Sequence, residues 1–357
     1  MDTLDGTDVV QTAAQAAALP RAPLVVLEAL EGWLDERGLG SGPLRASRLP
    51  GGHSNVTMLI RRPGLEVVLR RAPRPPLPPG AHDIVREARV LRGLETTAVP
   101  VPRIIDTCES EAVLGAPFVL MEYVPGLVLD ASLPPELEPT AERRRAAQAF
   151  IDTLVSVHAV DITAAGLAWL GRPGSYLERQ LRRFSGSWQI SRTRQVKAMT
   201  ALERQLRAGL PRDYQTTLIH GDARLGNAIF AADPPARVAA LIDWEMATLG
   251  DPLADLGYLS AAWTDRGQTD TPLFHLSPVT ALEGFPTLSE LIERYERRSG
   301  RSADDLPWYT ALACWKSAVF MEGNYRRALS GNSDDPFALG FRTGVEELAE
   351  LGLSALR

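Results

Sequence analysis

The chain has 357 residues, enough to bury a large hydrophobic core in one big domain or in two lobes. Its 45% hydrophobic and 23% charged content is ordinary for a soluble globular protein, and its formal net charge of −6 argues against a general nucleic-acid binder. The two cysteines, Cys108 and Cys314, are far apart and lack metal-ligand spacing. A disulfide framework or a zinc site is therefore not expected.

The first residues are acidic where a secretory signal would be basic, and no stretch approaches about 18 unbroken apolar residues. We therefore expect a cytoplasmic protein with no membrane partner. Residues 1–22 are expected to form a flexible tail, partly helical between Val9 and Leu19. After it, apolar residues at helical spacing predict a helix from Leu24 to Arg37.

A glycine-containing segment from Arg48 to Ile60 is predicted to form a strand, a turn and a second strand. Its turn could place backbone N–H groups over the phosphates of ATP, because glycine permits close approach. Gly-Gly turns are also common hairpin connections, so this signal is not specific by itself. The candidate phosphate-binding residues are Gly51, Gly52, Ser54 and Asn55.

The next strand, Glu66 to Arg71, carries Arg70 where kinase-like folds place a phosphate-binding lysine. An arginine can bind phosphate bidentately, although its geometry differs from that of a lysine. The helix predicted from Asp83 to Leu94 carries Glu87, the expected partner of Arg70. The alternative for this pair is an ordinary ion pair at the surface.

Two further strands are predicted, at Ile104-Ile105 and from Ala116 to Tyr123. The run that follows is expected to be a hinge, with backbone groups from Glu122 to Val124 facing the adenine base. A Pro-Gly pair at 125–126 then marks the boundary. The predicted organisation is a nucleotide-binding lobe at 23–124 and a catalytic, acceptor-binding helical lobe at 125–357.

The most informative stretch begins at Leu218 and contains His-Gly-Asp, an asparagine five residues after the aspartate, and Asp-Trp-Glu after a second apolar run. Asp222 is the candidate base, because a hydroxyl that attacks the γ-phosphate must lose a proton. Asn227 and Asp243 are the candidate Mg²⁺ ligands, since this hard cation prefers oxygen. A hairpin formed by residues 228–230 and 238–242 should bring them together, and Arg224 should neutralise phosphoryl charge.

Two further carboxylates and one helix are expected to support this stretch. Asp251 and Asp255, four residues apart at the start of a predicted helix, should accept backbone N–H bonds that hold the catalytic loop. A long amphipathic helix from Ala141 to His158 should lie under the loop. We interpret His158 as a helix-end residue and not as a catalyst.

This stretch resembles the aminoglycoside phosphotransferase and choline kinase-like family. The Asp, Asn and Asp of its His-Gly-Asp-x-x-x-x-Asn and later Ile-Asp-Trp/Phe-Glu patterns match Asp222, Asn227 and Asp243. Those relatives also carry a similar Gly-Gly-x-Ser-Asn turn. The patterns YLERQLRRFSGSW and HGDxRLGN are most similar to the kinase-like domains associated with acyl-CoA dehydrogenases, from Leu49 to about Tyr325.

The resemblance implies an α+β, protein-kinase-like fold, with an antiparallel sheet in the N-terminal lobe and a larger helical C-terminal lobe. It also implies Mg²⁺ and ATP, or GTP, as cofactors. The predicted activity is transfer of the γ-phosphate to a hydroxyl of a small molecule. The alternative is a pseudokinase-like module that binds nucleotide or acyl-CoA without transfer, which Arg70 and the unusual glycine turn motivate.

A basic insert lies between Arg172 and Arg212, where ten Arg or Lys stand against two Glu. One interpretation pairs these cations with acidic residues of the C-terminal helices, including Glu290, Glu293 and Glu296. The other is that they bind an anionic acceptor, such as one with a phosphate or coenzyme A tail. Aminoglycosides are polycations that such an insert would repel.

Overall fold

The computed structural model describes residues 8–49, 55–75, 77, 82–130, 132–171, 176–212, 215–268, 271–273, 276–330 and 338–357. The chain divides into two compact units. The first comprises Met1–Thr96, Val101–Pro125 and Asp243–Glu245, and the second comprises Thr97–Pro100, Gly126–Ile242 and Met246–Arg357. The sequence did not predict that a tripeptide from the catalytic stretch would belong to the N-terminal unit.

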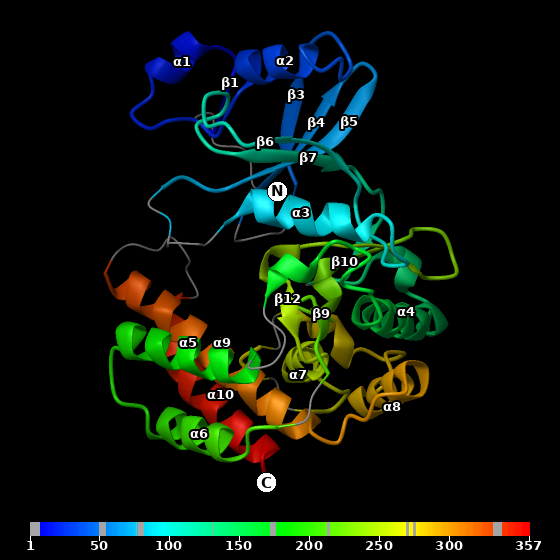
Figure 1. Cartoon of the computed structure of the whole chain (residues 1–357), viewed down its shortest axis with the longest axis vertical. Coiled ribbons are helices and arrows are strands. Elements are labelled where there is room, and N and C mark those ends of the chain that lie inside the picture. Colours follow the sequence, from blue (N-terminus) through cyan, green and yellow to red (C-terminus); the bar gives the residue numbers. More distant parts are fainter. Residues whose placement is uncertain are drawn as a thin grey trace. The chain divides into compact units, whose positions relative to one another are not determined.

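The first unit is built on an antiparallel five-stranded sheet (Figure 1). Its strand order is β3-β4-β5-β7-β6, so only the last two strands depart from the chain order. The strands are β3 (Arg45–Arg48), β4 (Val56–Arg62), β5 (Leu65–Arg71), β6 (Ile104–Cys108) and β7 (Phe118–Glu122). The last four were predicted as strands, and their differences from the predicted segments lie at the ends. Strand β3 ends at Arg48, the residue at which the first predicted strand begins, so that strand lies earlier in the chain than expected.

The two faces of this sheet are distinguished by the alternation of side chains along each strand. One face packs against α2 (Leu27–Asp35) in a core that contains Ile60, Leu69 and Trp33. The other face lies beside α3 (Ile84–Leu94), which runs next to β6 and β7 (Figure 1). Because Arg70 follows Leu69, its side chain points to the face that carries α3.

Of the stretch predicted as a flexible tail, residues 8–22 have a described structure. Strand β1 (Val9–Val10) pairs in parallel with β2 (Val25–Val26), and α1 (Ala13–Ala17) lies between them. A capping box of Thr12 and Gln15 begins α1. This strand pair was not predicted. All four of its residues are valines, whose β-branched side chains favour strands, and Val10 is buried by the pairing.

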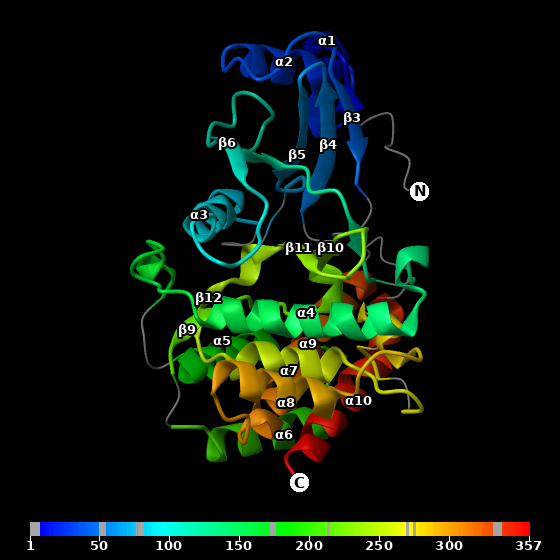
Figure 2. The ribbon, with the colours of Figure 1, turned by 90° about the vertical axis from the view of Figure 1, so that its right-hand side faces the viewer.

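The second unit contains two small antiparallel sheets, β11-β10-β8 and β12-β9, and most of the helices (Figure 2). Its strands are β8 (Leu127–Val128), β9 (Thr217–Ile219), β10 (Ala228–Phe230), β11 (Val238–Leu241) and β12 (Thr248–Gly250). Its α-helices are α4 (Thr140–His158), α5 (Tyr176–Ser191), α6 (Lys197–Ala208), α7 (Leu253–Ala262), α8 (Leu288–Ser299), α9 (Leu306–Leu329) and α10 (Phe341–Ala355). Together the two units confirm the α+β class.

Helix α9, with 24 residues, is the main support of the second unit, and it packs against α7, α10, α5 and α6. At its crossing with α7, a Cβ atom on Gly257 would lie 2.5 Å from the carbonyl carbon of Tyr309. Only glycine allows the two backbones to approach so closely. This contact fixes α7, whose first turn carries Asp255, the carboxylate that bonds the catalytic loop. The same role was predicted for Asp251, but Asp251 instead accepts from the backbone N–H of Leu253 at 2.8 Å and so bonds the start of α7. Among the described helices, none combines the length and apolar character needed to span a bilayer.

Candidate active site

The loop after β9 is a sharp turn centred on Gly221. This glycine has φ of +88°, and a Cβ atom there would lie 2.5 Å from the carbonyl oxygen of Met246. A residue with a side chain would be both strained and blocked at this position. The turn therefore presents Asp222 in a fixed direction, as the sequence predicted from the His-Gly-Asp pattern.

The buried carboxylate of Asp255 anchors this turn from below. It accepts hydrogen bonds from the backbone N–H groups of His220 and Gly221, both at 2.7 Å, and from Nε2 of His158 at 3.1 Å. Burial alone would raise the pKa of Asp255, but the bond from His158 and the bond from the Gly221 N–H outweigh it, so the pKa lies below its ordinary value. The supporting role predicted for Asp255 is therefore present in the structure.

The neutral tautomer of His220 follows from its contacts. Its Nδ1 accepts a hydrogen bond from the backbone N–H of Asp222 at 3.3 Å. Its Nε2 must then carry the proton, which it donates to the carbonyl oxygen of Ile242 at 2.9 Å. His220 therefore links the catalytic loop to the end of the next hairpin. His158 ends α4 and bonds Tyr295 through Nδ1, which is the helix-end role that we expected.

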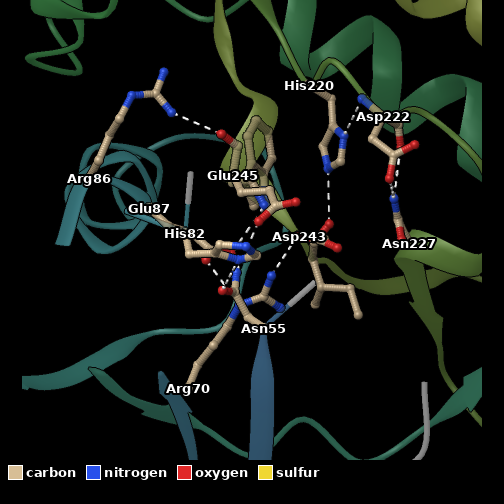
Figure 3. Close-up of polar contacts among 12 residues, drawn as sticks. Asn55, Arg70, His82, Arg86, Glu87, His220, Asp222, Asn227, Asp243 and Glu245 are labelled. Atoms are coloured by element: carbon tan, nitrogen blue, oxygen red, sulfur yellow. Dashed lines mark hydrogen bonds and ion pairs between the residues drawn. The ribbon is translucent and has the colours of Figure 1, made fainter. Parts of the chain in front are cut away.

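Asp222 and Asn227 form a hydrogen-bonded pair (Figure 3). The side-chain nitrogen of Asn227 donates to Oδ2 of Asp222 at 2.7 Å and to its backbone carbonyl at 2.8 Å. Because these bonds use the amide nitrogen, the amide oxygen remains as the acceptor of that side chain. Asn227 thus orients the carboxylate while keeping an oxygen that suits a hard cation.

Arg224 lies beside this pair. Its guanidinium is 3.9 Å from Oδ2 of Asp222 and 3.5 Å from Oδ1 of Asp130, and it donates to the carbonyl oxygen of Leu276 at 3.3 Å. These long contacts hold the charge near Asp222 without a tight ion pair. Asp130 was not singled out from the sequence, because nothing in its local pattern distinguishes it.

The predicted hairpin after Asn227 is formed by β10 and β11. The pair Ala228 and Leu241 opens the ladder, and the backbone N–H of Ile242 donates to the carbonyl oxygen of Asn227 at 2.8 Å. The next residue, Asp243, leaves the second unit and belongs to the first.

Within the first unit, Arg70 binds two carboxylates. Its guanidinium is 3.0 Å from Oε2 of Glu87 and donates to Oδ1 of Asp243 at 2.5 Å. Burial alone would lower the pKa of Arg70, but these two carboxylates raise it above its ordinary value. Burial raises the pKa of Glu87 to about 7, with the charge of Arg70 opposing it. The predicted partners Arg70 and Glu87 therefore meet, and they do so in a buried site and not at the surface.

The tripeptide from Asp243 to Glu245 is held by several side chains of the first unit (Figure 3). Glu87 accepts from the backbone N–H of Trp244 at 3.2 Å, and Arg86 donates to the carbonyl oxygen of Glu245 at 3.0 Å. Asp243 itself has φ of +66°, which an aspartate tolerates better than most residues. No role was predicted for Glu245, although it is the last residue of the Asp-Trp-Glu pattern.

The predicted nucleotide-binding residues have different outcomes. Gly51, Gly52 and Ser54 lie outside the described residues. Asn55 is buried, and its side chain donates to Oε2 of Glu245 at 2.9 Å and accepts from Nδ1 of His82 at 2.9 Å. Any phosphate contact by Asn55 would therefore have to come from its backbone.

The hinge residues are also partly engaged. The backbone N–H of Glu122 donates to the carbonyl oxygen of Arg103 at 2.8 Å, and the Glu122 carboxylate accepts from the Arg103 N–H at 3.3 Å. A backbone N–H that donates to adenine would therefore have to come from a later residue of the hinge, such as Val124.

The predicted donors fit a magnesium ion chemically. Asn227 has an amide oxygen left, and Asp243 has Oδ2 left, since Arg70 bonds to Oδ1. In the described part of the chain no group of three or more His, Cys, Asp or Glu could hold a metal by itself. Each of these oxygens is of the hard type that Mg²⁺ prefers, and this ion commonly completes its shell with water and substrate phosphates.

The expected pairing of the basic insert with Glu290, Glu293 and Glu296 is not what the structure shows. Glu290 pairs with Arg144, Glu293 pairs with Arg297, and Glu296 accepts from the backbone N–H of Ala303. One acidic residue of the C-terminal helices does pair with the insert, since Glu322 on α9 lies 2.7 Å from Arg194. The three acids named in the prediction have other partners, so they do not neutralise the insert.

A further cation, Lys316 on α9, was missed from the sequence. Its ammonium lies 5.0 Å from the ring centre of Phe184, and the guanidinium of Arg183 lies 5.9 Å from the same ring. Burial, and after it the charge of Arg183, lower the pKa of Lys316 to about 8, although the charges of Asp255 and Asp222 oppose the shift. Its signal in the sequence is a single charged residue within the apolar run ALACWKSAVF.

Comparison with known sequences gives one family and several relatives. A model of the phosphotransferase enzyme family matches residues 45–309. Acyl-CoA dehydrogenase family member 10 of Mus musculus is 36% identical over 332 residues, which cover 91% of this chain and 30% of that protein. Acyl-CoA dehydrogenase family member 11 of Gallus gallus is 35% identical over 320 residues, which cover 88% of this chain and 40% of that protein. The chain thus spans less than half the length of these curated relatives.

Solved structures show the same fold. A Ralstonia eutropha protein, described as a candidate aminoglycoside phosphotransferase, superimposes with a TM-score of 0.77 at 33% identity, covering 92% of this chain and 97% of that one. Aminoglycoside phosphotransferase APH(4)-Ia, in complex with AMP-PNP and hygromycin B, gives a TM-score of 0.60 at 17% identity, covering 92% and 98%. At that identity the second likeness concerns the fold alone. The predicted kinase-like fold is confirmed.

Proposed function

Because the chain belongs to the phosphotransferase enzyme family, as its resemblance predicted, we propose that it transfers the γ-phosphate of ATP or GTP to a hydroxyl group of a small molecule. The observation that carries this proposal is the Asp222–Asn227 pair on a loop fixed by the buried Asp255. A carboxylate held in one orientation by an amide, next to an arginine, is what proton acceptance during phosphoryl transfer requires.

In the proposed reaction, Asp222 orients the attacking hydroxyl and accepts its proton. Arg224 stabilises negative charge on the transferring group, since its guanidinium is held near Asp222 only by long contacts. Asn227 and Asp243 would hold Mg²⁺, which, when bound, neutralises charge on the nucleotide phosphates.

The nucleotide is proposed to bind through the first unit. Arg70 would contact its phosphates while Glu87 keeps the guanidinium in place. The glycine turn with Gly51, Gly52, Ser54 and Asn55 would supply backbone N–H groups, and the hinge from Glu122 to Val124 would face the base.

For the acceptor, we propose a small anionic molecule, which could include an acyl-CoA. The support is the position of Arg183 and Lys316 around Phe184, together with the influence of Asp222 on Lys316. Among the described residues, Arg183 and Lys316 form no ion pair. A polycationic aminoglycoside would be repelled there, whereas an anion would be attracted.

The experiment measures transfer of radiolabelled γ-phosphate from Mg·ATP to two acceptor panels, aminoglycosides and hydroxyacyl-CoA-type anions. Asp222→Asn serves as the catalytic control, because an amide cannot accept the proton. We expect transfer to the anionic panel, reduced by about 10²-fold or more in the variant. Transfer that the variant leaves unchanged would remove Asp222 from the mechanism, and transfer to aminoglycosides alone would overturn the proposed acceptor class.

The ion pair between Arg70 and Asp243 supports a second candidate, a module that binds nucleotide without transferring phosphate. In this case Arg70 would keep Asp243 from binding a metal ion. Stoichiometric nucleotide binding that does not depend on Mg²⁺, with no transfer to either panel, would favour this candidate over the kinase.

A further inference from the structure

The turn between α5 and α6 encloses a surface pocket of about 420 Å³ that the proposed reaction does not use. Four cationic side chains line it and no acidic one does, and Trp188 and Thr200 are also part of its wall. The four cations are Arg192, Arg194, Lys197 and Arg204. None of the lining residues comes from the loop between His220 and Asn227. A volume of this order is enough for a small organic ligand.

The turn is fixed by one fully buried carboxylate, that of Glu322 on α9. Glu322 accepts from the backbone N–H of Thr193 at 2.6 Å, from its hydroxyl at 2.7 Å and from Arg194 at 2.7 Å. Arg194 also donates to the backbone carbonyl of Arg342. These bonds hold the backbone of the turn in place, so a ligand would meet a preformed site.

The charge of Arg194 is thereby neutralised, but that of the other three cations is not. Among the described residues, Arg192, Lys197 and Arg204 have no acidic partner within ion-pair distance. The nearest acid in the sequence, Glu203, is occupied by the hydroxyl of Ser185 at 2.6 Å and by Arg207 at 2.9 Å. The pocket therefore has an excess of positive charge in a concave wall.

We propose that this pocket binds the phosphate group of a small anion, separately from the nucleotide and metal residues. A phosphate group carries close to two negative charges and several acceptor oxygens, which the three cations and the Thr200 hydroxyl that line the pocket can satisfy. The side of Trp188 offers an apolar wall to an organic portion of the ligand. The site does not depend on the proposed phosphoryl transfer, since it shares no residue with it.

The test is calorimetric titration of the full chain at low ionic strength with two probes, inorganic phosphate and glycerol 3-phosphate. The variant is Arg192→Gln with Lys197→Gln, both exposed side chains whose loss leaves the core untouched. The matched control removes two exposed arginines in surface ion pairs elsewhere, Arg61→Gln with Arg297→Gln. A third protein, Arg70→Gln, removes the proposed phosphate contact of the first unit.

We expect one saturable phosphate site, weakened by about tenfold or more in the pocket variant, because two charge-assisted contacts are lost. The surface control and Arg70→Gln should bind as the wild type does. Tighter binding of glycerol 3-phosphate would identify an organic phosphate as the occupant, and equal affinity would identify free phosphate. The proposal is overturned if the wild type shows no saturable binding, if the pocket variant binds equally well, or if only Arg70→Gln loses binding.

Discussion

Replacement of Asp255 by asparagine tests whether one buried carboxylate holds the catalytic loop. Its Oδ2 accepts from His220 N–H and from His158, and its Oδ1 accepts from Gly221 N–H. An asparagine has a single acceptor oxygen, so in either orientation its NH₂ group faces a donor. At least one charge-assisted bond is lost and a buried N–H is left unsatisfied, which together cost about 3 kcal/mol.

A loss of this size should lower the unfolding midpoint by roughly 6 °C or more for a unit of this length. The assay is thermal unfolding followed by circular dichroism, with Asp233→Asn as the matched control. Asp233 is also an aspartate in an ion pair, with Arg237, but it is exposed, so its replacement should leave the midpoint nearly unchanged. If the two substitutions lowered the midpoint equally, the anchoring role of Asp255 would be refuted.

The acid dependence provides a second check on the same residue. Because the folded-state pKa of Asp255 lies below its ordinary value of 3.8, its stabilisation should be fully present above about pH 4 and be lost as the pH falls through the folded value. The difference in midpoint between wild type and Asp255→Asn should therefore be constant near neutrality and shrink only in acid. A difference that already changes between neutral pH and about pH 5 would contradict this assignment.

Three further changes test other parts of the site. Gly221→Ala should displace the loop and reduce transfer by about tenfold or more, since its Cβ would meet the Met246 carbonyl; turnover equal to wild type would contradict this. Below about pH 8, where Lys316 is charged, Lys316→Met should raise the KM for an anionic acceptor, and Lys316→Arg should leave it unchanged. If the KM rose with pH equally in the wild type and in Lys316→Met, the titration of Lys316 would not be the cause of that rise. Arg70→Ala should weaken nucleotide binding, measured by calorimetry, by about tenfold or more, and unaltered binding would remove Arg70 from the nucleotide site.

The sequence alone was sufficient for the local part of the site. The spacing from His220 to Asn227 and the turn between β10 and β11 are short-range features, because a glycine with positive φ and a hairpin register depend on neighbouring residues. The role of Asp255 as an acceptor could also be predicted, since it lies in the first turn of a helix soon after the loop. The Arg70–Glu87 pair was predictable only because the resemblance indicated that the strand and the helix are adjacent.

The tertiary structure decided which charges meet over long distances in the sequence. The contacts of Arg70 with Asp243 and of Asn55 with Glu245 join residues 173 and 190 positions apart, and no local pattern encodes them. Likewise, composition showed that residues 172–212 are basic, but only the folded chain showed which acids are already occupied and that Glu322 fixes the turn that carries the excess charge. Local geometry follows from a few adjacent residues, whereas the pairing of charges depends on which surfaces the packed helices bring together.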